Sequence, residues 1–178
     1  MTQQGILYIA FGEEYVDEAV QSARSVKSNT NGYDTKIITD IEPPDEVFDI
    51  IQKDNPEDGF GDKIKYLRET EFEETVFLDT DTFVCSPIAD LFDLLNEYQF
   101  AAAHAPGRRP VAIESVPNAF PEFNTGVLCY RSSDEVFNFL KQWFEGYEQE
   151  RGTSLNDQVS FRRTIYGSDL DIATLPPE

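Results

Sequence analysis

The segment ETVFLDTDTFVCSP, residues 74–87, places two carboxylates at the end of an apolar run that is typical of a strand. Aspartate is unfavourable in strands and is rarely buried without a partner. Asp79 and Asp81 therefore predict a strand that ends at a polar site, where a cation or a group of hydrogen-bond donors meets both side chains. The alternative for the same two residues is an ordinary turn or a helix cap ahead of Pro87.

Strand and helix patterns alternate on both sides of this segment. The strand patterns cover residues 5–11, 35–40, 75–79, 99–105, 123–131 and 170–176, with a shorter apolar run at 47–52. The helical patterns cover residues 13–29, 61–72, 88–98, 133–150 and 154–167. Ser132 or Ser133 is the expected N-cap of the fourth helix. This alternation predicts an α/β fold, a three-layer α/β/α sandwich around a mostly parallel, mixed sheet.

The bulk composition is that of a packed globular protein. A chain of 178 residues fits one domain, 1–178, and no run of about 18 apolar residues predicts a transmembrane helix. The N-terminal apolar run lacks a basic leader and is too short for a signal peptide, so we expect a cytoplasmic protein. Cys85 and Cys129 both lie in apolar runs, where a reduced and buried thiol is expected.

The net charge of −20, from 14 basic and 34 acidic residues, argues against a nucleic-acid-binding surface. The acidic residues are spread along the whole chain and do not form one tail for a basic partner. Concentrated salt screens the repulsion among such charges. The composition, with only six lysines, therefore predicts a halophilic protein.

The ends of two predicted strands locate the candidate site. Asp40 ends one strand and Asp79 the other, and ligands of parallel sheets gather beyond the carboxyl ends of the strands. Residues two apart in an extended chain point to the same side, so Asp79 and Asp81 could share one divalent cation. Oxygen-only ligation suits Mg²⁺ or Mn²⁺, which complete their shells with phosphate oxygens. A nucleotide diphosphate is therefore the expected ligand.

Several segments together resemble one known family. FLDTDTFVCSPIADLF resembles the Asp-x-Asp segment of GT-A-fold glycosyltransferases. The segments ILYIAFGEEYVDEAVQSARSVK, IITD, DKIKYL, FNTGVLCYR and LNDQVSF are similar, in this order, to motifs of the glycogenin-like nucleotide-diphospho-sugar transferase group. The resemblance covers nearly the whole chain. It implies a GT-A-type fold and a metal-dependent hexosyltransferase that moves a sugar from a nucleotide-diphosphate sugar to an unknown acceptor.

The resemblance also implies roles for individual residues. Asp79 and Asp81 would be the metal ligands, with Asp79 also near the ribose and the donor sugar. Asp157 and Gln158 would lie close to the reaction centre and bind sugar hydroxyls. The residues expected to contact the nucleotide or the sugar are Phe11, Gly12, Tyr15, Asp40, Lys63, Asn124, Thr125 and Gly126. Without the resemblance, Lys63 could equally lie on a solvated helix face, and 157–158 would be an ordinary first helical turn.

A binding module without turnover is the first alternative function. In the family, a third metal ligand, usually a histidine, comes from a segment after the strand that residues 170–176 resemble. Here only Asp169, Asp171 or Glu178 could replace it, so we expect weak metal retention and a domain that lacks a C-terminal segment. The single histidine, His104, is expected to end a different strand.

A haloacid-dehalogenase-type phosphatase is the second alternative, because its first motif also reads Asp-x-Asp after an apolar strand. That chemistry would make Asp79 a nucleophile and Asp81 an acid, and it needs a later lysine to hold the phosphoryl group. The only lysine after the motif is Lys141, inside a predicted helix. The phosphatase is therefore the weaker hypothesis.

Residues 106–121 are rich in proline and predict a long loop, of the kind that often acts as a lid. Arg108 and Arg109 in this loop could clamp a phosphate or an acidic acceptor, or they could simply be solvated. Arg162 and Arg163 are expected to be charges on a helix surface.

Overall fold

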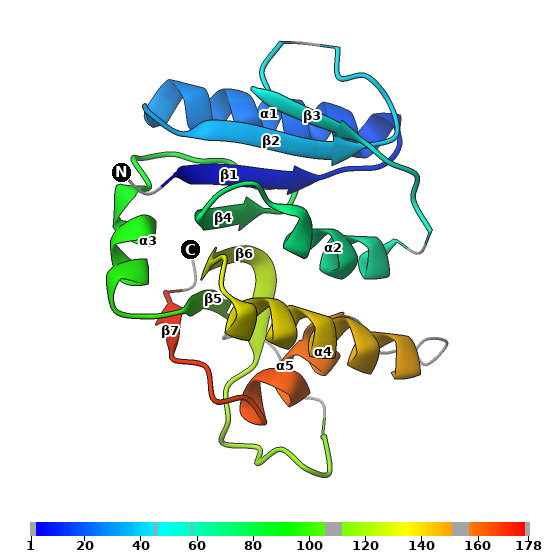
Figure 1. The fold of residues 1–178 in the computed structure, drawn as a ribbon, viewed down its shortest axis with the longest axis vertical. Coiled ribbons are helices and arrows are strands. Elements are labelled where there is room, and N and C mark those ends of the chain that lie inside the picture. Colours follow the sequence, from blue (N-terminus) through cyan, green and yellow to red (C-terminus); the bar gives the residue numbers. More distant parts are fainter. Residues whose placement is uncertain (1–2, 45, 58, 106–111, 151–156, 177–178) are drawn as a thin grey trace.

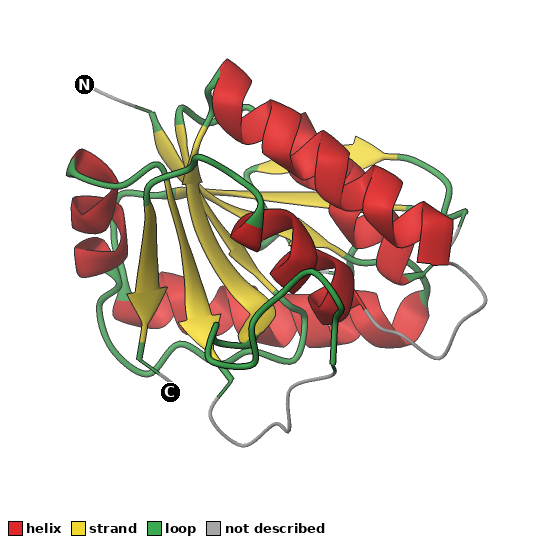
Figure 2. Cartoon of the chain, turned by 90° about the horizontal axis from the view of Figure 1, so that it is seen from below, coloured by secondary structure: helices red, strands yellow, loops and turns green. Residues whose placement is uncertain are grey.

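The computed structural model describes residues 3–44, 46–57, 59–105, 112–150 and 157–176. In this part of the chain a seven-stranded sheet is covered by helices on both faces (Figure 1 and Figure 2). The strands are β1 (Gln4–Ile9), β2 (Asp34–Thr39), β3 (Ile50–Lys53), β4 (Glu74–Leu78), β5 (Phe100–His104), β6 (Phe123–Arg131) and β7 (Ile172–Leu175). The α-helices are α1 (Glu13–Asn29), α2 (Phe60–Tyr66), α3 (Ala89–Asp93), α4 (Asp134–Glu150) and α5 (Asp157–Tyr166).

The strand order is β3-β2-β1-β4-β6-β5-β7. Strand β6 is antiparallel to both of its neighbours and every other pairing is parallel, so the sheet is mixed but mostly parallel. The chain leaves β1 toward β2 on one side and later adds β4 on the other side of β1. The connections that follow β1 and β4 therefore diverge at a topological switch point, the usual place of ligands in open α/β sheets.

Apolar side chains alternate along the strands between two cores. On one face of the sheet, Ile6 and Val76 belong to the core that α1 and α3 cover. On the other face, Leu7 and Phe77 belong to the core that α2, α4 and α5 cover. Both faces of these central strands are buried, which explains their nearly continuous apolar sequence. The predicted α/β/α sandwich is confirmed.

The predicted elements are present, but some are shorter than the sequence pattern indicated. Helix α2 gives way to a 3-10 turn at Leu67–Glu69, and α3 does so at Leu94–Asn96. Such turns commonly end helices, where the backbone tightens before it changes direction. Ser133 is the N-cap of α4, because its hydroxyl accepts a hydrogen bond from the Val136 N–H at 3.3 Å.

Two expectations about burial are wrong. Cys85 is exposed, because β4 ends at Leu78 and the apolar residues that follow are not in a strand. Cys129 on β6 is buried, as expected. Arg162 is 1% exposed and does not lie on the helix surface. Its guanidinium donates hydrogen bonds to the backbone carbonyls of Pro117 and Phe120, at 3.0 and 2.7 Å.

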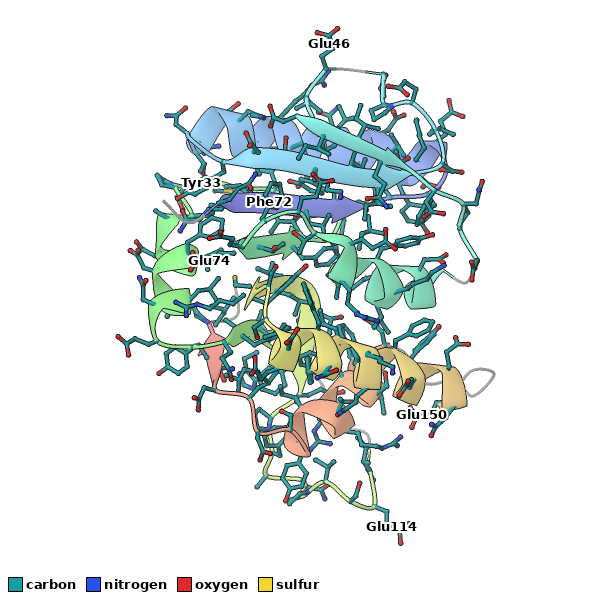
Figure 3. All side chains as sticks on the ribbon, viewed as in Figure 1. Tyr33, Glu46, Phe72, Glu74, Glu114 and Glu150 are labelled. Carbon is teal, nitrogen blue, oxygen red and sulfur yellow. The ribbon has the colours of Figure 1, made fainter. Side chains whose placement is uncertain are left out.

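Acidic side chains project from distant parts of the surface. Glu46 and Glu114 are exposed and point away from opposite ends of the molecule (Figure 3). Glu74, in contrast, is buried and accepts a hydrogen bond from the Gln4 side chain at 2.8 Å. Within the described ranges, no helix is long and apolar enough to cross a membrane.

Candidate functional site

A pocket of about 630 Å³ opens at the carboxyl ends of β1, β2 and β4, at the switch point of the sheet. Seven of the predicted site residues line it, together with seven others. The lining residues are Ile9, Ala10, Phe11, Gly12, Tyr15, Glu18, Asp40, Pro56, Gly59, Asp62, Lys63, Asp79, Thr80 and Asp81. The predicted residues Asn124, Thr125, Gly126, Asp157 and Gln158 do not line this pocket and lie on β6 and α5.

The turn between β1 and α1 forms one wall of the pocket. Gly12 has a φ of +87°, a backbone conformation that residues other than glycine rarely adopt. Its N–H donates to Asp40 Oδ1 at 2.8 Å, so Asp40 ties the end of β2 to this turn. The Phe11 ring packs on Tyr66, with ring centroids 5.4 Å apart, and the Tyr15 side chain is 56% exposed. Their predicted contacts with a nucleotide stay predictions.

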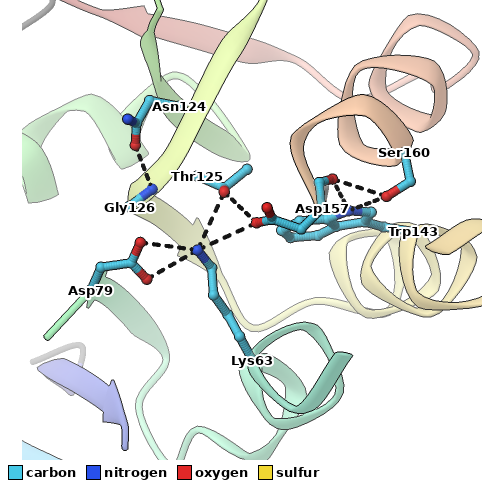
Figure 4. A network of polar contacts seen from close by, with 8 residues as sticks. All are labelled: Lys63, Asp79, Asn124, Thr125, Gly126, Trp143, Asp157 and Ser160. Atoms are coloured by element: carbon cyan, nitrogen blue, oxygen red, sulfur yellow. Dashed lines mark hydrogen bonds and ion pairs between the residues drawn. The ribbon is translucent and has the colours of Figure 1, made fainter. Parts of the chain in front are cut away.

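Lys63 on α2 connects the ends of three elements (Figure 4). Its Nζ lies 3.0 Å from Asp79 Oδ1, after β4, and 3.4 Å from Asp157 Oδ2, at the start of α5. The same ammonium donates to Thr125 Oγ1 on β6 at 3.2 Å, and the Thr125 hydroxyl donates to Asp157 Oδ2 at 2.6 Å. The solvated helix face considered for Lys63 is therefore wrong, since its side chain is 13% exposed.

The electrostatic environment of Asp79 is unfavourable for its charge. Burial raises the pKa of Asp79 above its ordinary value, and the carboxylates of Asp157 and Asp81 add to the rise. The ammonium of Lys63 opposes this rise but does not cancel it. Burial is the largest of these effects, so the charged form of Asp79 is less favourable here than in water.

Strand β6 approaches Asp79 through a glycine. The Asp79 N–H donates to the Gly126 carbonyl at 2.8 Å, and the Gly126 N–H donates to Asn124 Oδ1 at 2.7 Å. A Cβ on Gly126 would lie 3.0 Å from Asp79 Oδ2 and 2.9 Å from Asn124 Oδ1, which is too close for an unshifted side chain. A side chain at position 126 would therefore displace the Asn124 amide and the Asp79 carboxylate from these positions.

The first turn of α5 is fixed by a tryptophan that the sequence-based prediction missed. Trp143 on α4 donates from Nε1 to the Asp157 carbonyl at 3.0 Å and to Ser160 Oγ at 3.2 Å (Figure 4). The neighbouring Gln158 is buried, and its Oε1 has no hydrogen-bond partner among the described residues. A buried amide oxygen of this kind is a suitable acceptor for a ligand hydroxyl.

The carboxylates of Asp79 and Asp81 could supply part of the oxygen ligands that a hard divalent cation needs. Asp81 is exposed and forms no hydrogen bond or ion pair with another described residue, so its carboxylate is available. In the part of the chain that the structure describes, no group of three His, Cys, Asp or Glu residues could hold a metal ion. Asp79 and Asp81 would therefore supply two of about six oxygens, and water or phosphate the others.

The replacements considered for a third ligand do not lie beside Asp79. Asp169 and Asp171 precede β7, which runs in the same direction as β4. They therefore lie near the amino ends of these strands, whereas Asp79 follows the carboxyl end of β4. His104 ends β5 as expected, at the same edge as Asp79 but two strands away, roughly 10 Å at ordinary strand spacing. Glu178 lies outside the described residues, as do Arg108 and Arg109.

No protein-family model and no curated protein matches the chain, whereas a search of solved structures finds close resemblances of fold. GlyE, a glycosyltransferase of Streptococcus pneumoniae TIGR4, superposes with a TM-score of 0.67 at 14% identity, over 98% of this chain and 45% of its own. LgtC, a galactosyltransferase solved with donor and acceptor sugar analogs, gives a TM-score of 0.66 at 15% identity, over 96% of this chain and 72% of its own. A Desulfovibrio desulfuricans G20 protein proposed to be a nucleotide-diphospho-sugar transferase gives 0.63 at 12% identity, over 99% of this chain and 81% of its own.

The fold is thus that of GT-A-type glycosyltransferases, as the resemblance of the motifs implied. The described residues form the seven-stranded sheet and the switch-point pocket given above. The chain spans less than half of the length of GlyE. At 12–15% identity the comparison establishes the fold.

Proposed function

We propose that the chain binds a nucleotide-diphosphate sugar together with Mn²⁺ or Mg²⁺ in the switch-point pocket, and that it transfers the sugar to an acceptor of unknown identity. The observation that carries this proposal is the charge of the pocket. Five carboxylates and one ammonium line it, a formal charge of 1 − 5 = −4: Glu18, Asp40, Asp62, Asp79 and Asp81 against Lys63. A diphosphate would be repelled by this wall unless a divalent cation accompanied it.

The residues of the chain would divide the work of donor binding. Asp79 and Asp81 would hold the cation, which when bound supplies positive charge to the diphosphate leaving group. The exposed ring of Tyr15 offers a surface for the base, and the Gly12 turn lies beside it. Lys63 would donate to a phosphate or sugar oxygen of the donor, in exchange for one of its present contacts.

The second half of the proposed site lies at β6 and α5. Thr125 and Lys63 orient the Asp157 carboxylate, and Gln158 presents an unpaired buried oxygen. Both side chains suit the hydroxyls of a sugar, because a carboxylate and an amide oxygen accept hydrogen bonds at fixed positions. We therefore propose that Asp157 and Gln158 orient the donor sugar near the reacting carbon.

Binding without turnover is the second candidate function. The observation that favours it is that only Asp79 and Asp81 are proposed as metal ligands, and that the described residues contain no group of three His, Cys, Asp or Glu residues that could hold a metal ion. The phosphatase alternative has no such support. Lys141 forms an ion pair with Glu145 on the surface of α4, and its side chain is 58% exposed.

Calorimetric titration of a panel of nucleotide-sugars, with and without Mn²⁺, tests the proposal. We expect one or a few donors to bind in a Mn²⁺-dependent manner and to compete with the matching nucleoside diphosphate. Release of nucleoside diphosphate from the bound donor would then separate a transferase from a binding module. Binding of no donor under either condition would contradict both candidate functions.

A further inference from the structure

One side of α1 carries polar residues that contact the chain just after β4. Glu18, Ser22, Ser25 and Asn29 are spaced by four, three and four residues, which places them on one face of the helix. Each of the four bonds to the segment 80–84, which follows Asp79. We call these four residues the polar face of α1.

The contacts form a ladder along the segment. The Thr80 hydroxyl donates to Glu18 Oε2 at 2.7 Å, and the hydroxyls of Ser22 and Thr82 are 3.0 Å apart. The Val84 N–H donates to Ser25 Oγ at 2.8 Å. The Asn29 amide donates to the Val84 carbonyl at 2.9 Å.

The ladder is anchored in the interior of the protein. Ser22 and Ser25 are 1% and 3% exposed, and the hydroxyls of Ser22 and Tyr8 on β1 are 3.0 Å apart. The Thr82 hydroxyl also donates to the Asp79 carbonyl at 2.7 Å, which closes the turn that contains Asp81. Buried hydrogen bonds of this kind are costly to break, because each lost partner leaves a polar group without water.

Residues 79–84 have no strand or helix of their own to fix them. Strand β4 ends at Leu78, and the next helix, α3, begins at Ala89. Apart from the Asp79 N–H, which bonds to Gly126, the hydrogen bonds that join the backbone and hydroxyls of this segment to other described elements come from α1. Asp79 is therefore held by β6 and by Lys63 on α2, whereas the part of the turn that follows it is held by α1.

We infer that the polar face of α1 holds the Asp79-Thr80-Asp81 turn in the conformation that binds the divalent cation, with Glu18 acting through Thr80 as a positioning residue for metal binding. This inference rests on the proposed function. Thr80 lies between the two aspartates, so fixing its side chain restrains the backbone that carries both carboxylates. Glu18 and Thr80 line the same pocket as these carboxylates.

Paired substitutions separate positioning from charge. Glu18→Ala and Thr80→Val remove one partner each, whereas Glu18→Gln keeps an acceptor and Thr80→Ser keeps the hydroxyl. Ser28→Ala is the matched control on the same helix, since the exposed Ser28 hydroxyl donates to the Arg24 carbonyl of α1 itself. The probe is Mn²⁺ alone, and its binding is followed by water-proton relaxation.

We expect Glu18→Ala and Thr80→Val to weaken Mn²⁺ binding about tenfold, the effect of losing a hydrogen bond to a charged group. Glu18→Gln, Thr80→Ser and Ser28→Ala should stay within about twofold of the unsubstituted protein. Hydrogen–deuterium exchange should rise in residues 79–84 of the first two variants and stay unchanged in β1, which shows that the fold is intact.

The outcomes distinguish this inference from the proposed function. Normal Mn²⁺ affinity in Glu18→Ala and Thr80→Val would overturn the inference and leave the proposed function standing. A Glu18→Gln variant as weak as Glu18→Ala would assign the effect to charge and would overturn the positioning role. Absence of Mn²⁺ binding in the unsubstituted protein, even with a nucleoside diphosphate added, would overturn both.

Discussion

Replacement of Lys63 by methionine removes the only positive charge among the described residues that line the pocket. Its ammonium lies 3.0 Å from Asp79 and 3.4 Å from Asp157, so each attraction amounts to about 5 kcal/mol at an effective dielectric constant of about 20. The cost of taking these charges out of water offsets much of this energy. Removing one partner of a buried pair typically costs about 3–5 kcal/mol. Asp79 keeps 34% of its side-chain surface exposed and can be rehydrated, so we expect about 3 kcal/mol.

Urea and thermal unfolding measure this loss directly. A loss of about 3 kcal/mol corresponds to a fall of about 6–12 °C in Tm for a chain of this size. Lys65→Met is the matched control on the same helix, because Lys65 pairs with the exposed Glu57 and its loss should cost less than about 1 kcal/mol. Mn²⁺ should raise the Tm of Lys63→Met by more than it raises that of the unsubstituted protein, since a cation would relieve the repulsion among the carboxylates.

A double-mutant cycle tests the reasoning behind this magnitude. Asp157→Asn removes one of the two charges that Lys63 neutralises but keeps an oxygen that can accept from Thr125. The double variant Lys63→Met/Asp157→Asn should therefore be more stable than the sum of the single effects predicts, by about 1 kcal/mol or more. Additive effects, or a Lys63→Met variant as stable as Lys65→Met, would refute the account of the Lys63 network.

Three further predictions concern the rest of the chain. Arg162→Met should lower the free energy of unfolding by about 3 kcal/mol, because it leaves the backbone carbonyls of Pro117 and Phe120 without a donor. Arg68→Met, at an exposed position, should cost less than about 1 kcal/mol, and urea unfolding compares the two variants. Molar KCl should raise the unfolding midpoint substantially, because salt screens the repulsion of a net charge of −20, and a flat or falling midpoint would speak against a halophilic protein. Partial burial alone would raise the pKa of Asp49, but hydrogen bonds from Lys27 and Thr35 leave this pKa below its ordinary value of 3.8. The stability advantage over Asp49→Asn should therefore be present above about pH 4 and disappear as the pH falls through the lower pKa of the folded state, and an advantage that persisted at lower pH would contradict this assignment.

The fold followed from the sequence because its local signals agree with one another. The apolar runs at β1, β4 and β6 and the helical periodicity of α1 and α4 indicate the same sandwich that the structure shows. Strand order could not be derived from these patterns, since they do not determine which strands pair. Cys85 was misplaced because an apolar run alone does not show where a strand ends.

The carboxylates of the site were visible in the sequence, but their partners were not. Asp79 and Asp81 stand out because they interrupt an apolar segment, and Asp40 because it ends a strand. Arg162 and Glu18 look like ordinary helix-surface charges in the sequence, since their contacts come from residues 41–62 positions away. The one available signal for α1 was the spacing of Glu18, Ser22 and Ser25 along the edge of its apolar stripe, which only a known neighbour makes meaningful.

The affinity of a nucleoside diphosphate for the unsubstituted protein and for Asp81→Asn, each measured with Mn²⁺ and with a chelator, tests the central claim most directly. Asp81 is exposed and forms no contact with a described residue that would stabilise the fold, so the variant should fold normally. Asp17→Asn, an exposed change on α1 outside the pocket, is the matched control. The account predicts that Mn²⁺ strengthens binding about tenfold or more in the unsubstituted protein and in Asp17→Asn, and that Asp81→Asn loses this gain. An affinity that is the same with Mn²⁺ and with chelator in the folded, unsubstituted protein would contradict it.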